Sequence, residues 1–513
     1  MKQEGSIILI HRFLVAAEKY SDNPALEING EVWSYSALLR LSAGIAHRIK
    51  SVSDESSPVA ILADKSITAY AGILGALMAS RPYMPLNPRF PLNRNLKMIQ
   101  RAATDTIIVA DDQLDMADEI KQHHPGPLNM INPGPGDSVN IEPAELVPDI
   151  HSTAEQTAYL LFTSGTTGEP KGVPVSNRNV TAYMDNLKGM YDFHESDRFS
   201  QTFDLTFDLS VHDLFVCWLS GGCLCVPAAD KPLAYPKYIN EHKITVWFSV
   251  PSMAVMMDKM RLLRPAFFPS LKWSFFCGEP LLEKTAHHWQ QAAPSSRLIN
   301  LYGPTETTIA IAAYEWQQYS DKNKSGNGIV SIGKIFKDQQ YRILDDEKQT
   351  LEAKSQGLLH LSGTQVIDGY LQAREDESMS FVKLDPKSDI SWYNTGDLVL
   401  EDADHDLFFL GRADAEVKIS GYRVNMLEID ETIRRLAKIN NLATIAVQDQ
   451  STGTQSLVSF VENDEEEFNE QHLLEICRKQ LPWYMVPQKI IRIAHLPLND
   501  NGKIDRNKLI ELL

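Results

Sequence analysis

The sequence predicts an α/β protein with parallel sheets covered by helices and a smaller domain at the C-terminal end. Short apolar runs alternate with amphipathic helical stretches, as in Val59–Leu62 before Ile67–Met78 and Thr106–Ala110 before Leu114–His123. This alternation is typical of parallel sheets with helices on their faces. The chain has 513 residues, more than the roughly 250–300 that one hydrophobic core supports. We therefore expect at least two domains.

The pattern of apolar and polar residues changes near residue 331. Residues 331–410 contain short β-type runs separated by acidic turns, which predict a β-rich subdomain. After Gly411 and Arg412 a last block has its own strand and helix pattern, so we place the domain boundary near Asp414. The expected β-rich strands are Tyr341–Leu344, Gly357–Ser362, Leu398–Leu400 and Leu407–Leu410; the last block has expected strands Val417–Ile419, Leu442–Val447 and Ser456–Phe460 and helices Met426–Lys438 and Gln471–Gln480.

Composition excludes several classes of protein. The formal net charge of -18 argues against a nucleic-acid-binding protein. No segment reaches 18 uninterrupted apolar residues, so membrane insertion is not expected. Five cysteines are too few for a disulfide framework, and Cys223 and Cys225 read more readily as buried strand residues than as metal ligands. The cytoplasm is the expected compartment.

The run Leu161–Gly172 (LFTSGTTGEPKG) is the strongest local signal for chemistry. An apolar stretch leads into a loop that offers hydroxyls and backbone N–H groups to a phosphate, with a lysine close behind. The spacing differs from the P-loop pattern, and taken alone the loop is equally compatible with a flexible turn. The residues that would bind a phosphate are Thr163, Ser164, Gly165, Thr166, Thr167 and Lys171.

Four further runs follow in the same chain. They are Asn300–Thr308 (NLYGPTETT), Tyr393–Asp397 (YNTGD), Gly411–Val424 (GRADAEVKISGYRV) and Asn501–Asp505 (NGKID). With the loop above, they resemble, in order, the motifs of the adenylate-forming superfamily, which contains acyl-CoA synthetases, luciferases and the adenylation domains of peptide synthetases. The resemblance runs from about residue 10 to the end of the chain. It implies a large N-terminal domain, 1–412, with two doubly wound sheets, and a small mobile α+β domain, 413–513.

The resemblance also implies roles in binding ATP and Mg²⁺. Tyr302 would stack on adenine, Thr305 would bind the α-phosphate and Glu306 would hold Mg²⁺, which prefers oxygen ligands. Asp397, assisted by Arg412, would accept the ribose hydroxyls. Lys503 would bridge the substrate carboxylate and the phosphate, although a lysine in such a loop is otherwise a solvated surface charge. The remaining residues expected at the nucleotide are Asn300, Leu301 and Gly303.

Domain movement is a further implication of the resemblance. Asp414 matches the hinge position, about which the C-terminal domain would swing between an adenylating and a thioester-forming state. In the second state Lys418 and Gly421 would line the channel for pantetheine. We find no carrier domain after Lys503, so the expected acceptor is the phosphopantetheine thiol of a separate carrier protein, with Arg478 and Lys479 as candidate contacts.

The segment Phe207–Val211 resembles the amino-acid-activating branch of the superfamily, in which the aspartate, here Asp208, pairs with the substrate ammonium. A buried ammonium needs such a partner; the alternative is that Asp208 or Ser210 caps the following helix. The other residues expected around the substrate are Leu209, His212, Ser249, Phe275, Cys277, Leu301, Ile309 and Ala310. His212 and Ser249 would bond a polar substrate, each other or water.

The bulk of Phe275 and Leu301 predicts a small amino acid such as glycine, alanine or D-alanine. The run Phe276–Leu281 resembles stand-alone D-alanine–carrier-protein ligases, but the chain departs from that group at Leu301 and His212. The predicted enzyme is therefore an ATP-dependent amino acid–carrier-protein ligase. An acyl-CoA synthetase acting on an acid without an amino group is the alternative, and a catalytically silent nucleotide-binding protein is a second one.

Overall fold

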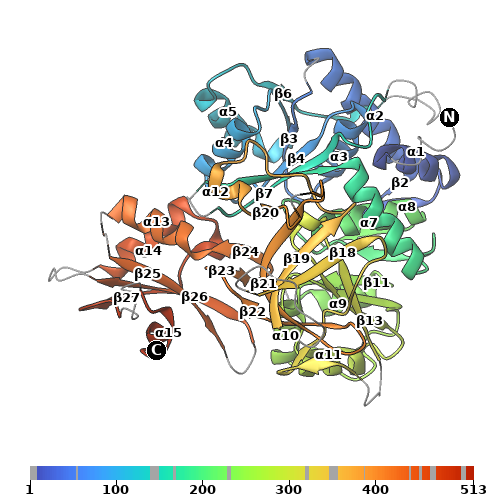
Figure 1. The fold of residues 1–513 in the computed structure, drawn as a ribbon. Helices are drawn as coiled ribbons and strands as arrows, with labels where there is room; N and C mark the ends of the chain where they lie inside the picture. The colour runs from blue at the N-terminus through green and yellow to red at the C-terminus, as the bar shows by residue number, and fades with distance from the viewer. Residues whose placement is uncertain are drawn as a thin grey trace.

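The computed structural model describes residues 8–53, 56–138, 150–165, 169–227, 233–317, 323–345, 356–385, 387–437, 439, 441–449, 453–462, 469–497 and 504–513. Thr166, Thr167 and Lys503, which the sequence places at the phosphates, lie outside the described residues. The chain forms a large N-terminal part and a C-terminal unit that sits on one side of it (Figure 1). Among the described residues, no helix combines the length and apolar character that crossing a bilayer requires.

A six-stranded sheet with the order β6-β5-β3-β4-β7-β8 begins the fold. Its strands are parallel except for β8, which pairs antiparallel with β7. Alternate residues of β3 enter different hydrophobic clusters, Val59 and Ile61 on one face, Ala60 and Leu62 on the other. A strand buried on both faces in this way explains its continuous apolar sequence. The bounds are β3 Val59–Leu62, β4 Tyr83–Leu86, β5 Thr106–Val109, β6 Asn129–Ile131, β7 Thr157–Thr163 and β8 Lys171–Ser176.

Helices cover both faces of this sheet. The predicted helices Ile67–Met78 and Leu114–His123 are α3 and α5, with the bounds that the sequence pattern gave. The cluster that contains Val59 also holds residues of α2 (Tyr35–Val52) and α3, whereas α4 (Leu92–Arg101) and α5 pack on the opposite face. The doubly wound arrangement predicted from the sequence is thus confirmed.

The second sheet has nine strands, in the order β17-β14-β13-β12-β11-β9-β10-β1-β2. Its central strands are parallel, and antiparallel strands lie at both edges. Helices α7 (Asn177–Met190) and α8 (Leu209–Ser220) share one hydrophobic cluster with strands of this sheet. Helices α10 (Pro251–Lys259) and α11 (Glu283–Ala292) share another. The strand bounds are β1 Pro24–Ile28, β2 Glu31–Ser34, β9 Arg198–Ser200, β10 Cys223–Val226, β11 Val246–Ser249, β12 Trp273–Phe276, β13 Arg297–Tyr302, β14 Ala312–Trp316 and β17 Lys334–Ile335.

The predicted β-rich region forms a separate five-stranded antiparallel sheet. Its strands are β18 Gln339–Leu344, β19 Gln356–Gly363, β20 Phe381–Val382, β21 Trp392–Glu401 and β22 Leu407–Arg412. The C-terminal unit then begins with a β-hairpin and continues into a three-stranded sheet with its own helices (Figure 1). Its elements are β23 Glu416–Ile419, β24 Tyr422–Asn425, α13 Met426–Ala437, β25 Leu442–Gln448, β26 Gln455–Glu462, α14 Glu470–Gln480, β27 Lys489–Ile493 and α15 Arg506–Ile510.

Candidate functional site

The carboxyl ends of the parallel strands bring the sequence motifs together. Cys277 follows β12, Tyr302 ends β13, and Asp208 precedes α8. Asp208, Cys277 and Thr305 line one cavity with Thr163 and Ser164, which end and follow β7. Ligands of open α/β sheets bind at this edge, where loops from separate strands converge. The local sequence of each strand fixes where its loop starts, and the sheet order decides which loops meet.

Ser164 and Gly165 of the predicted phosphate loop contact the C-terminal unit. The Ser164 hydroxyl donates to the Arg423 carbonyl at 2.8 Å and accepts from the Asn425 N–H at 3.1 Å. The Gly165 N–H donates to a carboxylate oxygen of Glu428 at 3.3 Å. A Cβ at Gly165 would lie 2.3 Å from the Glu169 carbonyl oxygen, so only glycine fits this turn. The backbone donor that the sequence assigns to phosphate is therefore paired with a carboxylate here.

Glu306 is fully buried in the turn after β13. Arg423 donates through Nη1 to both of its carboxylate oxygens at 2.9 Å, and the Tyr370 hydroxyl donates at 2.6 Å. Burial alone would raise the pKa of Glu306, but the Arg423 charge and the Tyr370 hydrogen bond hold it below its ordinary value. Lys171 is buried nearby, its ammonium 5.5 Å from the centre of the Tyr370 ring. Glu306 is therefore an ionised carboxylate near the loop predicted to bind phosphate, and the Arg423 guanidinium is already bonded to it.

A second cavity, about 70 Å³ in volume, has the residues predicted for adenosine on its walls, among them Asn300, Tyr302, Asp397 and Arg412. The Tyr302 hydroxyl donates to Asp397 Oδ2 at 2.5 Å, and Arg412 donates to Oδ1 at 2.7 Å. Burial raises the pKa of Asp397, while the Arg412 charge opposes that rise. The Asn300 side chain donates to the Ser331 carbonyl at 2.9 Å, so it fastens β13 to the next segment. Leu301 and Gly303 also line this cavity.

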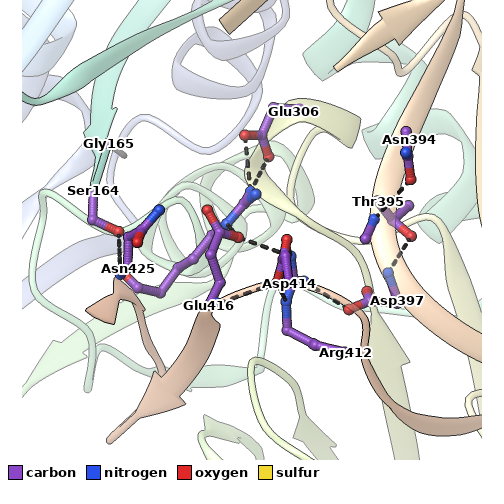
Figure 2. A network of polar contacts seen from close by, with 12 residues as sticks. Ser164, Gly165, Glu306, Asn394, Thr395, Asp397, Arg412, Asp414, Glu416 and Asn425 are labelled. Atoms are coloured by element: carbon purple, nitrogen blue, oxygen red, sulfur yellow. Dashed lines mark hydrogen bonds and ion pairs between the residues drawn. The ribbon is translucent and has the colours of Figure 1, made fainter. Parts of the chain in front are cut away.

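Arg412 is the centre of an ionic network that reaches the predicted hinge. Besides Asp397 it donates to both oxygens of Asp414, at 2.8 and 2.6 Å, and to Glu416 at 2.8 Å (Figure 2). The Ala413 N–H donates to the Gly396 carbonyl at 2.9 Å. The segment that joins the N-terminal part to the C-terminal unit is therefore tied to the strand that carries Asp397.

Asp208 is 5% exposed, and its Oδ2 has no hydrogen-bond partner among the described residues. Burial raises the pKa of this carboxyl to about 6, against the opposing effects of the Lys418 charge and the Thr305 hydroxyl. Asp208 occupies the N-cap position of α8 but its side chain makes no capping bond, and the Ser210 hydroxyl donates to the Phe207 carbonyl at 2.7 Å. Asp208 is therefore the N-cap residue by position, but neither its side chain nor that of Ser210 caps the helix. A buried acceptor without a partner is costly and calls for an explanation.

The other predicted substrate residues form a tightly packed wall. His212 Nδ1 lies 2.7 Å from the Tyr183 hydroxyl, and burial lowers the pKa of His212 to about 3, so the ring is neutral. Ser249 accepts from the Trp247 indole at 3.0 Å and donates to the Val250 carbonyl. The idea that His212 and Ser249 satisfy each other is thus wrong. Leu209, Phe275, Cys277, Leu301, Ile309 and Ala310 are all 0–2% exposed.

Backbone strain and thiol chemistry add detail to this wall. Thr308 and Ile309 have φ values of 58° and 73°, a conformation that β-branched residues rarely adopt. The Thr308 hydroxyl donates to the Gln365 carbonyl at 2.5 Å, which helps to hold the turn. Burial raises the pKa of the Cys277 thiol to about 12, so it is a packing residue and not a thiolate nucleophile.

Lys418 and Gly421 lie on the β23–β24 hairpin, which the C-terminal unit presents to the cavity that contains Asp208. Lys418 lines that cavity, and the Gly421 N–H donates to Glu279 at 2.7 Å. Lys418 also lines a larger cavity of about 400 Å³, whose walls come from α10, from Glu279 and Pro280, and from β25, β26 and α15. Of the two residues predicted for the pantetheine channel, Lys418 therefore lines both the cavity that contains Asp208 and the wide cleft.

Sequence reasoning missed the contacts between the two parts of the chain. Arg423 stands inside the GRADAEVKISGYRV run, but nothing in the run indicates that it pairs with Glu306. Glu428 forms a buried ion pair with Arg94, 2.9 Å away and 334 residues distant in sequence. No local pattern could have revealed that pair. Tyr370 and Tyr183 were missed for the same reason.

The cysteine pair on β10 resembles a metal site only superficially. Ligand atoms of Glu27, Cys223 and Cys225 lie within 4.8 Å of one another. Arg198 forms an ion pair with Glu27, and the Cys225 thiol together with the Arg198 charge lowers the pKa of Cys223. A guanidinium thus already supplies the positive charge that a metal would bring.

The features assembled at this edge define a nucleotide-dependent enzyme of the adenylate-forming type, and comparison with known proteins agrees. The AMP-binding enzyme family matches residues 13–371, and the AMP-binding enzyme C-terminal domain matches residues 428–503. The chain belongs to the AMP-binding enzyme family, whose members use ATP.

Relatives and solved structures refine this placement. The chain is 31% identical to a D-alanine–D-alanyl carrier protein ligase of Listeria welshimeri, with 98% of each chain covered. It is also 31% identical to a region of tyrocidine synthase 3 of Brevibacillus parabrevis, of which it spans only 7%. The crystal structure of the Vibrio cholerae adenylation domain AlmE, in complex with glycyl-adenosine-5'-phosphate, is 28% identical and has a TM-score of 0.87, covering 98% of this chain and 97% of that one.

Proposed function

We propose that this protein is an amino acid–carrier-protein ligase. It activates a small amino acid with ATP as an aminoacyl-adenylate and transfers the aminoacyl group to the phosphopantetheine thiol of a separate carrier protein. The observation that carries this proposal is Asp208, a buried carboxylate whose Oδ2 has no partner in the described part of the chain. A substrate ammonium would satisfy that oxygen, whereas an acid without an amino group would leave it unpaired.

The packed wall favours a small substrate. Phe275 and Leu301 are buried, with 0% and 2% exposure, and the Phe275 ring packs against His212, with 5.4 Å between the ring centres. The glycyl-adenylate named for AlmE and the D-alanine named for the Listeria ligase are both small amino acids, which supports the same conclusion. We therefore propose glycine, alanine or D-alanine as the substrate.

In the first step an oxygen of the substrate carboxylate attacks the α-phosphorus of ATP, the bond to the β-phosphate breaks, and pyrophosphate leaves. Asp208 orients the substrate through its ammonium, and Thr305 lies close enough to Asp208 to reach the reacting groups from the same cavity. Tyr302 and Asp397 would hold the adenosine, with Arg412 fixing the Asp397 carboxylate. Lys503 would supply a positive charge opposite the developing negative charge.

Glu306 is the residue that would hold Mg²⁺, because it is an ionised carboxylate beside the phosphate loop and Mg²⁺ prefers oxygen ligands. Bound there, the ion would neutralise charge on the phosphates. The ion would compete with Arg423, whose guanidinium now donates to both oxygens of Glu306. The ligand set fits the ion in chemistry.

In the second step the carrier thiol loses its proton, its sulfur bonds to the adenylate carbonyl carbon, and AMP leaves with the bonding electrons of the mixed anhydride. We propose that the thiol arrives through the cleft of about 400 Å³ that Lys418 lines. Asp414 would be the hinge of the C-terminal unit. We place the reaction in the cytoplasm, where ATP is available and the five cysteines, all unpaired here, stay reduced.

The test is amino-acid-dependent exchange of labelled pyrophosphate into ATP, measured with the proteinogenic amino acids, D-alanine and β-alanine. We expect strong exchange with one small amino acid. Absence of exchange with all of them, by folded protein that binds ATP, would contradict the proposal and favour an acyl-CoA synthetase. Matched assays with acetate and propionate distinguish that alternative, because those acids occupy the same volume without the ammonium.

A further inference from the structure

The mouth of the 400 Å³ cleft is bordered by one helix with an unusual outer surface. Pro251, Ser252 and Val255 of α10 line the cleft on the N-terminal side, and Ile510 of α15 lines it on the C-terminal side. On the outside of α10, Met256 is 43% exposed and Met260, the residue after the helix, is 42% exposed. Four residues apart, the two lie on the same face. Exposed methionines are adaptable apolar contacts and are common at binding surfaces.

Two arginines follow these methionines directly. Arg261 and Arg264 are exposed, and neither has a carboxylate partner within 4 Å among the described residues. The Arg264 guanidinium lies 4.1 Å from the centre of the Phe267 ring, which holds it in place. Because the chain as a whole has a net charge of -18, these two arginines place positive charge beside an apolar face on a protein that is acidic overall.

The backbone conformation at Arg261 is a further indication that this side chain has a role outside the fold. Its φ is 57°, in the left-handed region at the end of a helix, where glycine is strongly preferred. An arginine at this position costs stability that a glycine would avoid. The side chain makes no ion pair with the described residues, so no ionic contact within the fold offsets that cost.

From these observations we infer that Met256, Met260, Arg261 and Arg264 form the docking surface for the carrier protein, named here the α10 patch, and that this carrier presents an acidic, partly apolar surface. The inference rests on the proposed function, since it assumes that a phosphopantetheine thiol enters the adjoining cleft. Charge complementarity selects the partner: two unpaired guanidinium groups attract a carboxylate-rich surface and speed its encounter. Arg478 and Lys479, suggested by the sequence, lie on α14, which contributes no described residue to the cleft.

The experiment uses the full-length enzyme and a panel of holo-carrier proteins. From the panel we take a carrier that accepts the aminoacyl group from the unaltered enzyme. We then compare R261E/R264E with the control K121E/K188E, which reverses two exposed lysines on α5 and α7. We expect kcat/KM for the carrier to fall at least tenfold at low salt in R261E/R264E alone. The difference should shrink as salt screens the surface charges.

Two further measurements separate docking from chemistry. Pyrophosphate exchange and aminoacyl transfer to free pantetheine should stay unchanged in R261E/R264E, because neither needs the α10 patch. The milder variant R261G/R264Q removes both charges and also relieves the backbone at position 261. It should lose carrier transfer while unfolding at the same or a higher temperature than the unaltered protein.

The outcomes distinguish this inference from the proposed function. If the unaltered enzyme exchanges pyrophosphate but aminoacylates no holo-carrier, the proposed acceptor is wrong and the docking surface falls with it. If the enzyme aminoacylates a carrier and R261E/R264E does so at an unchanged kcat/KM, the docking surface alone is overturned. An equal loss in K121E/K188E would also overturn it, because the effect would then reflect overall charge.

Discussion

Replacing Asp208 with asparagine should make the empty protein more stable and inactive at the same time. Burial raises the pKa of this carboxyl from 3.8 to about 6. At about 1.4 kcal/mol per pKa unit, that rise of roughly 2 units corresponds to about 3 kcal/mol. Because the folded-state pKa is the higher one, this stability is present below pH 3.8 and is lost as pH rises through 6. An asparagine side chain carries no charge to desolvate, so D208N should recover much of it at pH 7.

Activity should move in the opposite direction. Removing one partner of a buried ion pair costs about 3–5 kcal/mol, so kcat/KM for the amino acid should fall by roughly 150- to 5,000-fold in D208N while ATP binding persists. The unaltered enzyme should show a KM for the amino acid that rises as pH falls through about 6, where Asp208 becomes protonated. Thermal unfolding at pH 7 and pyrophosphate exchange check both effects. A less stable D208N, or one that still activates the amino acid, would refute the reasoning.

Three other substitutions have distinct expected outcomes. Asp397→Ala removes the carboxylate that accepts from Tyr302 and Arg412 and that would accept the ribose hydroxyls. Hydrogen bonds to a charged group are worth about 1.5–3 kcal/mol each, so KM for ATP should rise at least tenfold. An unchanged KM in steady-state assays would count against the ribose role. Phe275→Ala should admit larger amino acids in the exchange assay, and a specificity profile restricted to the original substrate would show that Phe275 does not limit the pocket. Lys503→Ala should lose most adenylation with an unaltered far-UV circular dichroism spectrum, and full activity would remove Lys503 from the mechanism.

Much of the fold could be read from local patterns. Continuous apolar runs such as Val59–Leu62 predicted strands buried on both faces, and the structure places alternate residues of that strand in two separate clusters. The change of pattern near residue 331 predicted the antiparallel sheet that begins at Gln339. These features depend on the periodicity of neighbouring residues, which a sequence displays directly.

Contacts between distant segments could not be predicted in the same way. The sequence suggested a polar substrate, Ser249 or water as a partner for His212, but it did not indicate Tyr183, which lies on a different helix and contacts His212 Nδ1. The Arg94–Glu428 pair joins α4 to α13. Such pairs depend on how whole elements are placed against each other, and a single sequence carries no local signal for that placement. The sequence predicted that the loops at the strand ends form the site, but not that Arg423 and Glu428 contact the residues of those loops.

The contacts of the C-terminal unit suggest how the two chemical steps of the proposed reaction would be kept apart. Arg423 occupies the Glu306 carboxylate, and Glu428 accepts from the Gly165 N–H. A cation is thus bound where Mg²⁺ would bind, and a carboxylate where a phosphate oxygen would bind. Because Arg423 and Tyr370 already donate to Glu306 and the guanidinium repels a second cation, binding of Mg²⁺ there would weaken the Arg423 contact and compete with this docked position. Departure of pyrophosphate would free Glu306 and the Gly165 N–H. Their contacts with Arg423 and Glu428 could then form, and these contacts would favour the arrangement in which Lys418 faces the cleft and the thiol.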